Sequence, residues 1–456
     1  MLAIFVVLAR LLGPEPFGFA ALAMTAPSIL AAPVTKGIPD AIIQRPDLEP
    51  IHLDSSFWLL TACGIALTAI TWISSPLIAA AFGEPLLEQL VRWTSIVILL
   101  QAVAAVPAAV LKRQLNFRLF TLRTLVGNLA GGLTGVGMAL NGFGVWSLVG
   151  MQLVRSAVEA AVLLIGSAWR PRLRYSHSRC RELFGFAGPI MVHALWNFVN
   201  EEMPKVFIGA FLGPLAVGVY ALARRCLDFL IEIFVAPLNA VAMPAVSRVQ
   251  HDLARIDRFF DGAVRMTAIA GFPAFVGFAA IAPIAVPLIF GEQWKDSIIA
   301  IQILMLLGLQ RTIDGIAAFA ILALGRSDLI LNLNITYTVI GIVLLPTAAQ
   351  VSLEMTIVAL IACNALLLPV FLYLIHRIAH IDVMRPLAIF PRLAGASALM
   401  FILVTAWQAH SPIEMPQIAI LASAILIGAA SYGVSAVILV RPDLLSVRDV
   451  LLRLRN

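Results

Sequence analysis

The chain has 456 residues, of which 61% are hydrophobic and only 12% charged, and its mean hydropathy is +0.97. Soluble domains carry roughly 25% charged residues, and helices that are apolar all round belong in a bilayer or in a very large core. This composition excludes a soluble enzyme, a DNA-binding protein and a disordered scaffold. The net charge of +6 is scattered in short runs, which do not indicate a nucleic-acid partner. The sequence therefore predicts an all-α, polytopic membrane protein.

Apolar stretches separated by turn residues divide the chain into about fourteen candidate spans of the length that a membrane helix needs. In chain order they are 2–12, 17–35, 56–81, 88–110, 119–140, 143–166, 184–207, 215–243, 264–290, 298–324, 329–349, 354–375, 388–409 and 417–440. The first stretch is shorter than a full span, so we expect helix 1 to be truncated. The spans group into an N-terminal six-helix lobe (1–166), a basic linker (167–183), a C-terminal six-helix lobe (184–378), helices 13 and 14 (379–440) and a tail (441–456).

Lysine and arginine are distributed unevenly among the loops. With both termini in the cytoplasm, most of the 31 basic residues lie on cytoplasmic segments, and the opposite side holds only Lys295. This bias predicts an even number of spans. The linker from Arg170 to Arg181 is the most basic of these segments. It serves either as a simple topological anchor or as a contact for anionic lipid headgroups.

A short sequence repeats at an offset of 200 residues. Residues 12–23 (LGPEPFGFAALA) and 212–223 (LGPLAVGVYALA) match at seven of twelve positions. A second echo, Phe82-Gly83-Glu84 against Phe290-Gly291-Glu292, follows in the same order. Six predicted spans separate the copies, which predicts two lobes that cross the membrane in the same sense. The alternative is that LGPxxxG is only a recurrent tight turn.

Ionisable side chains at membrane depth are costly and usually face a cavity or a partner. In this chain they gather on spans 7, 8 and 10, where helical spacing places them on shared faces. Two interpretations remain open, namely ion pairs that lock helices together and a water-filled transport cavity. In the second interpretation the substrate-contact candidates are Arg224, Arg225, Arg311, Asn197 and Asn200, and the ion-coupling candidates are Glu201, Asp228, Glu232 and Asp314. The spacing also predicts a pair between Glu201 and Lys205.

The sequence contains no GxSxG, Walker A or HExxH motif and no long outer loop that could carry a catalytic site. We therefore expect neither an enzyme nor transport driven by ATP hydrolysis within this chain. No cofactor or metal is indicated, although coupling to a proton or sodium gradient fits the membrane carboxylates.

Several motifs resemble polysaccharide flippases of the multidrug/oligosaccharidyl-lipid/polysaccharide (MOP) exporter superfamily. They are Leu8-Ala9-Arg10-Leu11-Leu12-Gly13-Pro14, Ala41-Ile42-Ile43-Gln44-Arg45, Phe143-Gly144-Val145-Trp146, Trp169-Arg170-Pro171, Leu212-Gly213-Pro214, Phe290-Gly291-Glu292-Gln293-Trp294 and Leu322-Ala323-Leu324-Gly325-Arg326. The resemblance implies a bacterial inner-membrane protein with two six-helix lobes and an extra helix pair. It also implies flipping of undecaprenyl-diphosphate-linked oligosaccharides to the periplasmic leaflet for exopolysaccharide, capsule or lipopolysaccharide synthesis.

The partners implied are the lipid-linked oligosaccharide, membrane lipids, and a polysaccharide polymerase with its chain-length machinery. A drug or cation antiporter of the same superfamily is one alternative, and a membrane glycan polymerase or an assembly scaffold is another. The chain departs from the family pattern at Pro204, where related sequences often carry Asp, and at Ala236 and Ala240, where arginines are common. These departures weaken the transfer of any coupling site from relatives.

Overall fold

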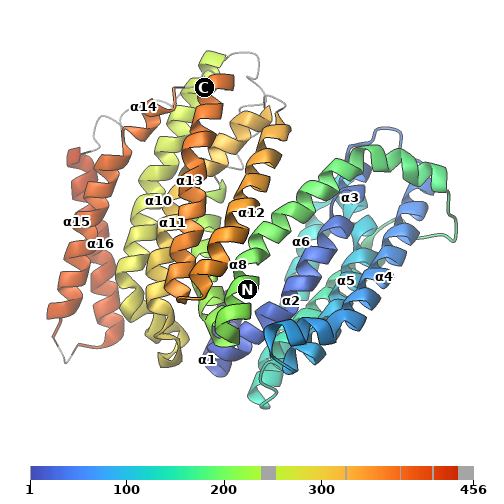
Figure 1. Cartoon of the computed structure of the whole chain (residues 1–456), viewed down its shortest axis with the longest axis horizontal. Coiled ribbons are helices and arrows are strands. Elements are labelled where there is room, and N and C mark those ends of the chain that lie inside the picture. Colours follow the sequence, from blue (N-terminus) through green and yellow to red (C-terminus); the bar gives the residue numbers. More distant parts are fainter. Residues whose placement is uncertain (1, 238–252, 324–325, 380–381, 413–414, 440–456) are drawn as a thin grey trace. The chain divides into compact units, whose positions relative to one another are not determined.

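The computed structural model describes residues 2–237, 253–323, 326–379, 382–412 and 415–439 (Figure 1). It divides into two compact units, Met1–Gly218 and Val219–Asn456. Ten of the described helices are long and apolar enough to cross a membrane. The prediction of an all-α, polytopic membrane protein is thus confirmed. The count of fourteen spans and the lobe boundaries stay predictions, and the tail at 441–456 lies outside the described residues.

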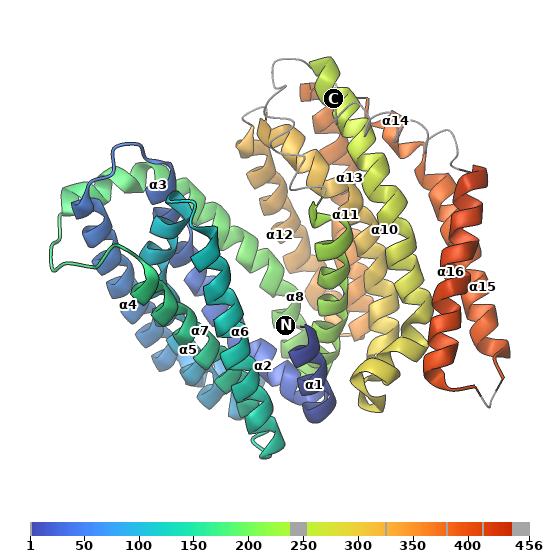
Figure 2. The same ribbon diagram turned by 180° about the vertical axis from the view of Figure 1, so that it is seen from behind.

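Unit 1 is built from paired helices that pack along their lengths. Its elements are α1 (Leu2–Leu12), α2 (Pro14–Thr35), α3 (Ile38–Gln44), α4 (Pro50–Phe82), α5 (Leu86–Arg113), α6 (Phe117–Leu140), α7 (Trp146–Gly166) and the first part of α8 (His177–Phe234). Helix α4 packs against α5, and α6 packs against α7, as both views show (Figures 1 and 2). Helix α5 lies at the centre of the unit, because it also contacts α2, α3 and α7.

Unit 2 continues from the second part of α8. Its further elements are α10 (Leu253–Phe290), η1 (Glu292–Trp294), α11 (Ser297–Ala323), α12 (Ser327–Ala349), α13 (Leu353–Ala379), α14 (Met384–Leu387), α15 (Phe390–His410) and α16 (Gln417–Leu439). Helix α10 packs against α11 and α15, and α13 contacts both α11 and α12. Helices α15 and α16 form a hairpin fixed to α10, where the Tyr432 hydroxyl donates to the Ile269 carbonyl oxygen at 2.9 Å.

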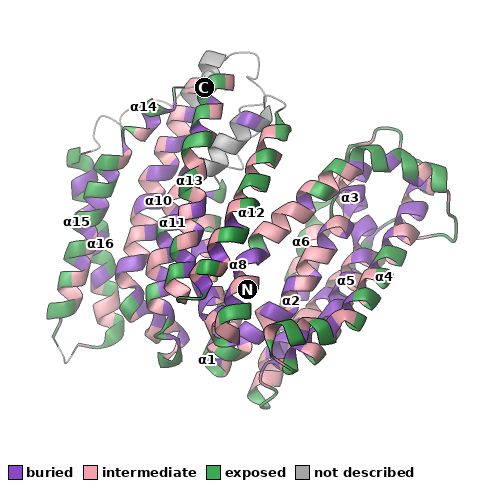
Figure 3. Ribbon diagram, viewed as in Figure 1, coloured by how far each residue is buried: buried purple, intermediate pink, exposed green. Residues whose placement is uncertain are grey.

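Each predicted span coincides with a helix, except where spans 8, 10 and 14 reach past the described residues. Large apolar side chains remain exposed on the outer faces, for example Leu133 on α6 and Ile73 on α4. Figure 3 shows buried and exposed residues alternating around most helices. An apolar exposed surface of this kind is suited to contact with lipid tails. The backbone beneath it is helical, as it must be where lipid offers no hydrogen bonds.

The sequence repeat is a structural repeat as well. Gly13 (φ 76°, ψ 179°) and Gly213 (φ 79°, ψ 180°) share one unusual conformation, and each precedes a proline that begins a helical segment. Gly18 in the first copy of the repeat packs against the second copy, and Gly218 in the second copy packs against the first. A Cβ on Gly18 would lie 1.7 Å from the Pro214 carbonyl oxygen, and a Cβ on Gly218 would lie 1.8 Å from that of Pro14. The crossing is therefore reciprocal, which a chance recurrence of a tight turn does not explain.

Candidate functional site

Unit 1 contains a cavity of about 320 Å³ among α2, α3, α5, α6 and α7. We call it the cationic cavity. Its ionisable lining consists of Lys36, Asp40, Lys112, Arg123, Arg155 and Glu159, with Gln101, Gln152, Thr35 and Ser156 as further polar groups. Four basic and two acidic side chains leave an excess of two positive charges. Such a lining favours a dianionic ligand over a neutral or cationic one.

Glycines on α6 bring α7 close enough to place its charges in the cavity. Gly127, Gly131 and Gly135 are spaced four apart and buried against α7. A Cβ at Gly127 would lie 2.6 Å from Cγ of Glu159, and one at Gly131 would lie 2.6 Å from the Met151 carbonyl oxygen. Small residues at this spacing let two membrane helices approach until their backbones nearly touch. The close approach fixes the position of α7 along α6 and its rotation about its own axis.

The two charges of α7 partly neutralise each other. Arg155 Nε donates to Glu159 Oε1 at 3.0 Å, four residues further along the helix. The side chains are about one third and one fifth exposed, so this pair remains accessible from the cavity. Pairing leaves the net positive charge of the cavity on Lys36, Lys112 and Arg123, opposed only by Asp40.

An aromatic ring separates two of these cations. Nζ of Lys112 lies 5.1 Å from the centroid of the Phe120 ring, and Cζ of Arg123 lies 4.0 Å from it. Cation–π contacts hold the two side chains without neutralising them. Within the described part of the chain, the buried Nε of Arg123 has no hydrogen-bond partner. Arg123 therefore keeps a donor for a ligand oxygen, and a planar guanidinium suits a phosphate group.

The residues predicted on spans 8 and 10 form a separate network in unit 2. Arg224 Nε donates to Asp228 Oδ1 at 2.9 Å, and Arg225 lies 3.8 Å from Glu232. Arg311 on α11 is partly buried. The side chain of Asp314 lies outside the described residues.

The residues predicted on span 7 lie on the first part of α8, in unit 1. Asn197 approaches His193 at 3.3 Å, and Asn200 is partly buried, whereas Glu201 is exposed. The predicted pair between Glu201 and Lys205 is wrong. Lys205 Nζ instead donates to Glu202 Oε2 at 2.7 Å, because the helix turns Glu202 inward and Glu201 outward.

Glu202 is the buried acid of this helix, with 7% of its surface exposed. Its carboxylate also accepts a hydrogen bond from Thr25 Oγ1 on α2, at 3.2 Å. The sequence analysis named Glu201 as the coupling candidate and gave Glu202 no role. Helical spacing alone does not show which of two adjacent acids faces the protein interior. The signal that was available is helix α2, which carries the repeat and packs on the side of Glu202. Among the described residues, no group of three or more His, Cys, Asp or Glu could hold a metal ion.

The residues of the cationic cavity were also not predicted to lie together. Lys36, Asp40 and Lys112 stand at helix ends, where charges ordinarily mark topology. The available signal was the Gly127-x3-Gly131-x3-Gly135 spacing, which indicates where α7 packs and therefore where Arg155 and Glu159 point.

The fold and the cavity define an all-helical, multi-pass membrane protein with a cation-rich internal space. Two solved structures share the fold. The lipid II flippase MurJ, in its inward closed conformation, has a TM-score of 0.81 and 14% identity, covering 97% of this chain and 96% of that one. An inward-facing multidrug resistance transporter of the MATE family, from the MOP superfamily, has a TM-score of 0.67 and 15% identity, covering 83% and 94%.

The chain belongs to the family described as "Polysaccharide biosynthesis protein", whose model matches residues 7–299. This confirms the resemblance to a polysaccharide biosynthesis family. A curated relative, the succinoglycan biosynthesis transport protein ExoT of Rhizobium meliloti (strain 1021), is 29% identical over 290 residues. That match covers 63% of this chain and 58% of the relative, so the chain spans less than two thirds of that relative's length.

Proposed function

We propose that the protein is a flippase that moves undecaprenyl-diphosphate-linked oligosaccharide repeat units from the cytoplasmic to the periplasmic leaflet by alternating access. The observation that carries this proposal is the excess of two positive charges in the cationic cavity. A diphosphate diester bears one negative charge on each phosphate, and the cavity matches that charge. Membership in a polysaccharide biosynthesis family and a relative named as a succinoglycan transport protein support the choice of substrate class.

In this proposal Arg123 and Lys112 hold the diphosphate. Both cations are fixed in orientation by Phe120 and neither is neutralised by it. Arg155 and Glu159 then form a switchable pair, because a phosphate oxygen that approaches Arg155 competes with Glu159 for the same Nε donor. Arg224, Arg225, Arg311, Asn197 and Asn200 stay proposed as further substrate contacts.

We further propose that an ion gradient drives the cycle, with a proton or sodium ion bound at a membrane carboxylate. Glu201, Asp228, Glu232 and Asp314 stay proposed as coupling groups. The contacts of Glu202 with Thr25 and Lys205 support adding Glu202 to this set, since buried carboxylates within membrane helices usually serve a function. On the far side, a polymerase and its chain-length machinery would receive the flipped unit.

The test is leaflet-resolved labelling of the lipid-linked oligosaccharide in cells depleted of this protein. We expect the intermediate to accumulate on the cytoplasmic face and to return to the periplasmic face on complementation. If the intermediate reaches the periplasmic face normally while polymer is missing, the protein acts after flipping, as a polymerase or scaffold would. If polymer is unaffected while drug efflux falls, the antiporter alternative replaces the flippase.

The proposed orientation, with both termini in the cytoplasm, has its own test. In a background without the four native cysteines, an impermeant maleimide should label Lys295→Cys from outside intact spheroplasts. Arg174→Cys should react only after permeabilisation. The reverse pattern would invert the topology and with it the direction of transport.

A further inference from the structure

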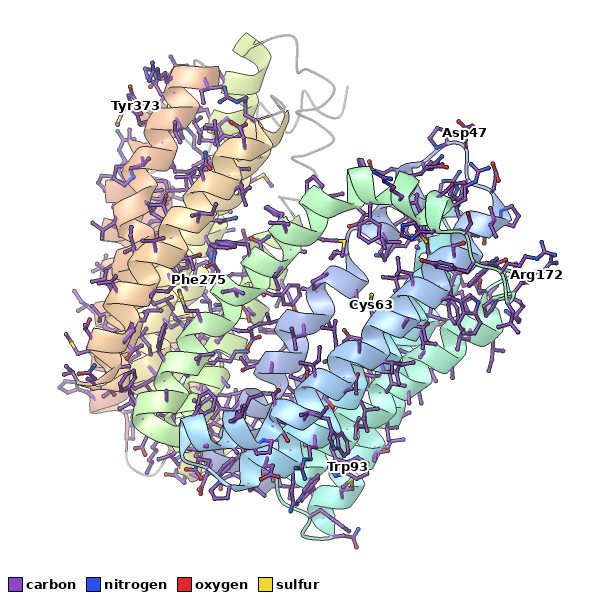
Figure 4. All side chains as sticks on the ribbon, turned by 45° about the vertical axis from the view of Figure 1, so that its right-hand side comes forward. Asp47, Cys63, Trp93, Arg172, Phe275 and Tyr373 are labelled. Atoms are coloured by element: carbon purple, nitrogen blue, oxygen red, sulfur yellow. The ribbon has the colours of Figure 1, made fainter. Side chains whose placement is uncertain are left out.

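The loop that joins α7 to α8, residues 167–176, presents arginines and large apolar side chains at its surface. Arg172, Leu173, Arg174 and Tyr175 are all exposed, with 89% of the Leu173 surface and 54% of the Tyr175 surface accessible. Figure 4 shows Arg172 pointing away from the helices. As far as the structure describes the chain, the guanidinium groups of Arg172 and Arg174 have neither an ion pair nor a hydrogen bond. The surface is thus both strongly basic and apolar at its outermost point.

Buried polar side chains of α4 hold the backbone of this loop. Asp54, which is buried, accepts a hydrogen bond from the Arg172 backbone N–H at 3.2 Å, and the indole of Trp58 donates to the Arg172 carbonyl oxygen at 2.8 Å. The buried hydroxyl of Ser55 accepts from the Ser176 N–H at 2.9 Å. Because these contacts fix the backbone in advance, a ligand need not bear the entropic cost of ordering the loop.

A tight turn places Leu173 at the tip. The Arg174 N–H donates to the Arg172 carbonyl oxygen at 2.7 Å, which closes a three-residue turn around Leu173. An apolar tip is thereby flanked on both sides by a guanidinium group.

Three other basic residues nearby are already engaged. Arg170 donates to carbonyl oxygens in the last turn of α7, where a cation also suits the helix dipole. Arg45 pairs with Glu182, and Arg179 pairs with both Glu182 and Glu49. These acids are therefore occupied, and the positive charge of the loop tip has no counterpart on the described protein surface around it.

We propose that the loop tip binds the phosphate headgroup of an anionic phospholipid. The tip connects two membrane helices and so lies at the level of the headgroups, where arginine can bind phosphate with two parallel N–H donors. Tyr175 belongs to the amphipathic residue types that are enriched at this depth. Leu173 inserts toward the acyl chains. This role is independent of the substrate that the protein transports.

The test uses the full-length protein in detergent, titrated with phosphatidylglycerol or phosphatidylethanolamine and examined by native mass spectrometry. We expect the wild type to retain phosphatidylglycerol in preference to phosphatidylethanolamine. Removal of both charges in R172Q/R174Q should weaken phosphatidylglycerol binding by about fivefold for each arginine. The matched control is R118Q/R377Q, which removes two exposed arginines outside the loop and gives the same net charge.

A third variant and a competitor separate a lipid from other ligands. Leu173→Ser should weaken phosphatidylglycerol binding although the charge is unchanged, and inorganic phosphate at millimolar concentration should not displace the lipid. Equal losses in the two double variants would overturn the proposal, since the effect would then be one of general charge. Displacement by inorganic phosphate would overturn it as well. Unchanged lipid binding in R172Q/R174Q together with loss of a co-purifying protein would identify a protein-docking surface instead.

Discussion

The two units handle charge inside the membrane differently. In unit 2 the arginines of α8 pair with acids on their own helix, as Arg224 does with Asp228, and these contacts cancel charge locally. In unit 1 four helices and a short helical turn converge to leave two uncompensated positive charges around a cavity. Pairs four residues apart stabilise a helix at little cost, whereas an excess of one sign is justified only by a ligand of the other sign. We therefore propose that the N-terminal unit carries the main anion contact.

The largest expected effect tests this difference directly. Arg123→Gln should reduce appearance of the oligosaccharide on the periplasmic face by at least about tenfold, since a charge-assisted hydrogen bond contributes roughly 1.5–3 kcal/mol. Membrane abundance should not fall, because removing a charge from the membrane favours insertion. The measurement is leaflet-resolved labelling at matched expression, with Arg377→Gln, an exposed arginine of α13, as the control. Normal flipping by Arg123→Gln would remove the cationic cavity from the pathway.

Arg311→Gln provides the corresponding change in unit 2. We expect lower export at unchanged abundance, by a smaller factor than for Arg123→Gln, because Arg311 does not line the cationic cavity. Leaflet-resolved labelling of the two variants in parallel shows which unit contributes more to export. A larger loss for Arg311→Gln would reverse the assignment of the main anion contact to unit 1.

A third prediction concerns the close packing of α7 against α6. Gly131→Ala should displace α7, since the new Cβ would meet the Met151 carbonyl oxygen at 2.6 Å and a backbone atom cannot rotate away. Overpacking of this kind costs about 1–3 kcal/mol, and we expect a lower melting temperature in detergent and slower flipping. Gly137→Ala, on the same helix with nothing within 4 Å, is the control and should change neither. Equal behaviour of the two variants would show that close packing does not position Arg155.

The last prediction concerns stability and compares two acids on α8, of which Asp228 has the smallest expected effect. Glu202→Gln should destabilise the protein by about 3 kcal/mol, because it leaves Lys205 without its partner in a mostly buried place. Asp228→Asn should cost less than about 1 kcal/mol, because the Asp228 side chain is 38% exposed. Thermal unfolding in detergent measures both, and E202Q/K205M should recover part of the loss. A greater cost for Asp228→Asn would mean that the unit 2 pair, not the unit 1 pair, supports the fold.

Much of the fold could be predicted from the sequence, because membrane helices leave long apolar stretches bounded by Gly, Pro and charge. The positions of α4, α5 and α12 follow from such stretches alone. The LGPxxxG repeat likewise identified two segments that share a backbone conformation at Gly13 and Gly213. These features are local, so a single segment contains the information that specifies them.

The cationic cavity could not be predicted in the same way, because it depends on how separate helices converge. Lys36 and Lys112 are 76 positions apart, and nothing in either neighbourhood distinguishes a cavity lining from a topological charge. The choice between Glu201 and Glu202 failed for a related reason. A helix rotates by about 100° per residue, and only the partner on α2, Thr25, shows which of the two faces inward.

The reciprocal contact of Gly18 and Gly218 has a consequence for how this chain can diverge. Each position limits the other copy, because any side chain at one would strike the carbonyl oxygen that precedes the other along its helix. Two positions 200 residues apart are therefore constrained together. A residue larger than glycine can replace Gly18 or Gly218 only if the two helices move apart at this contact.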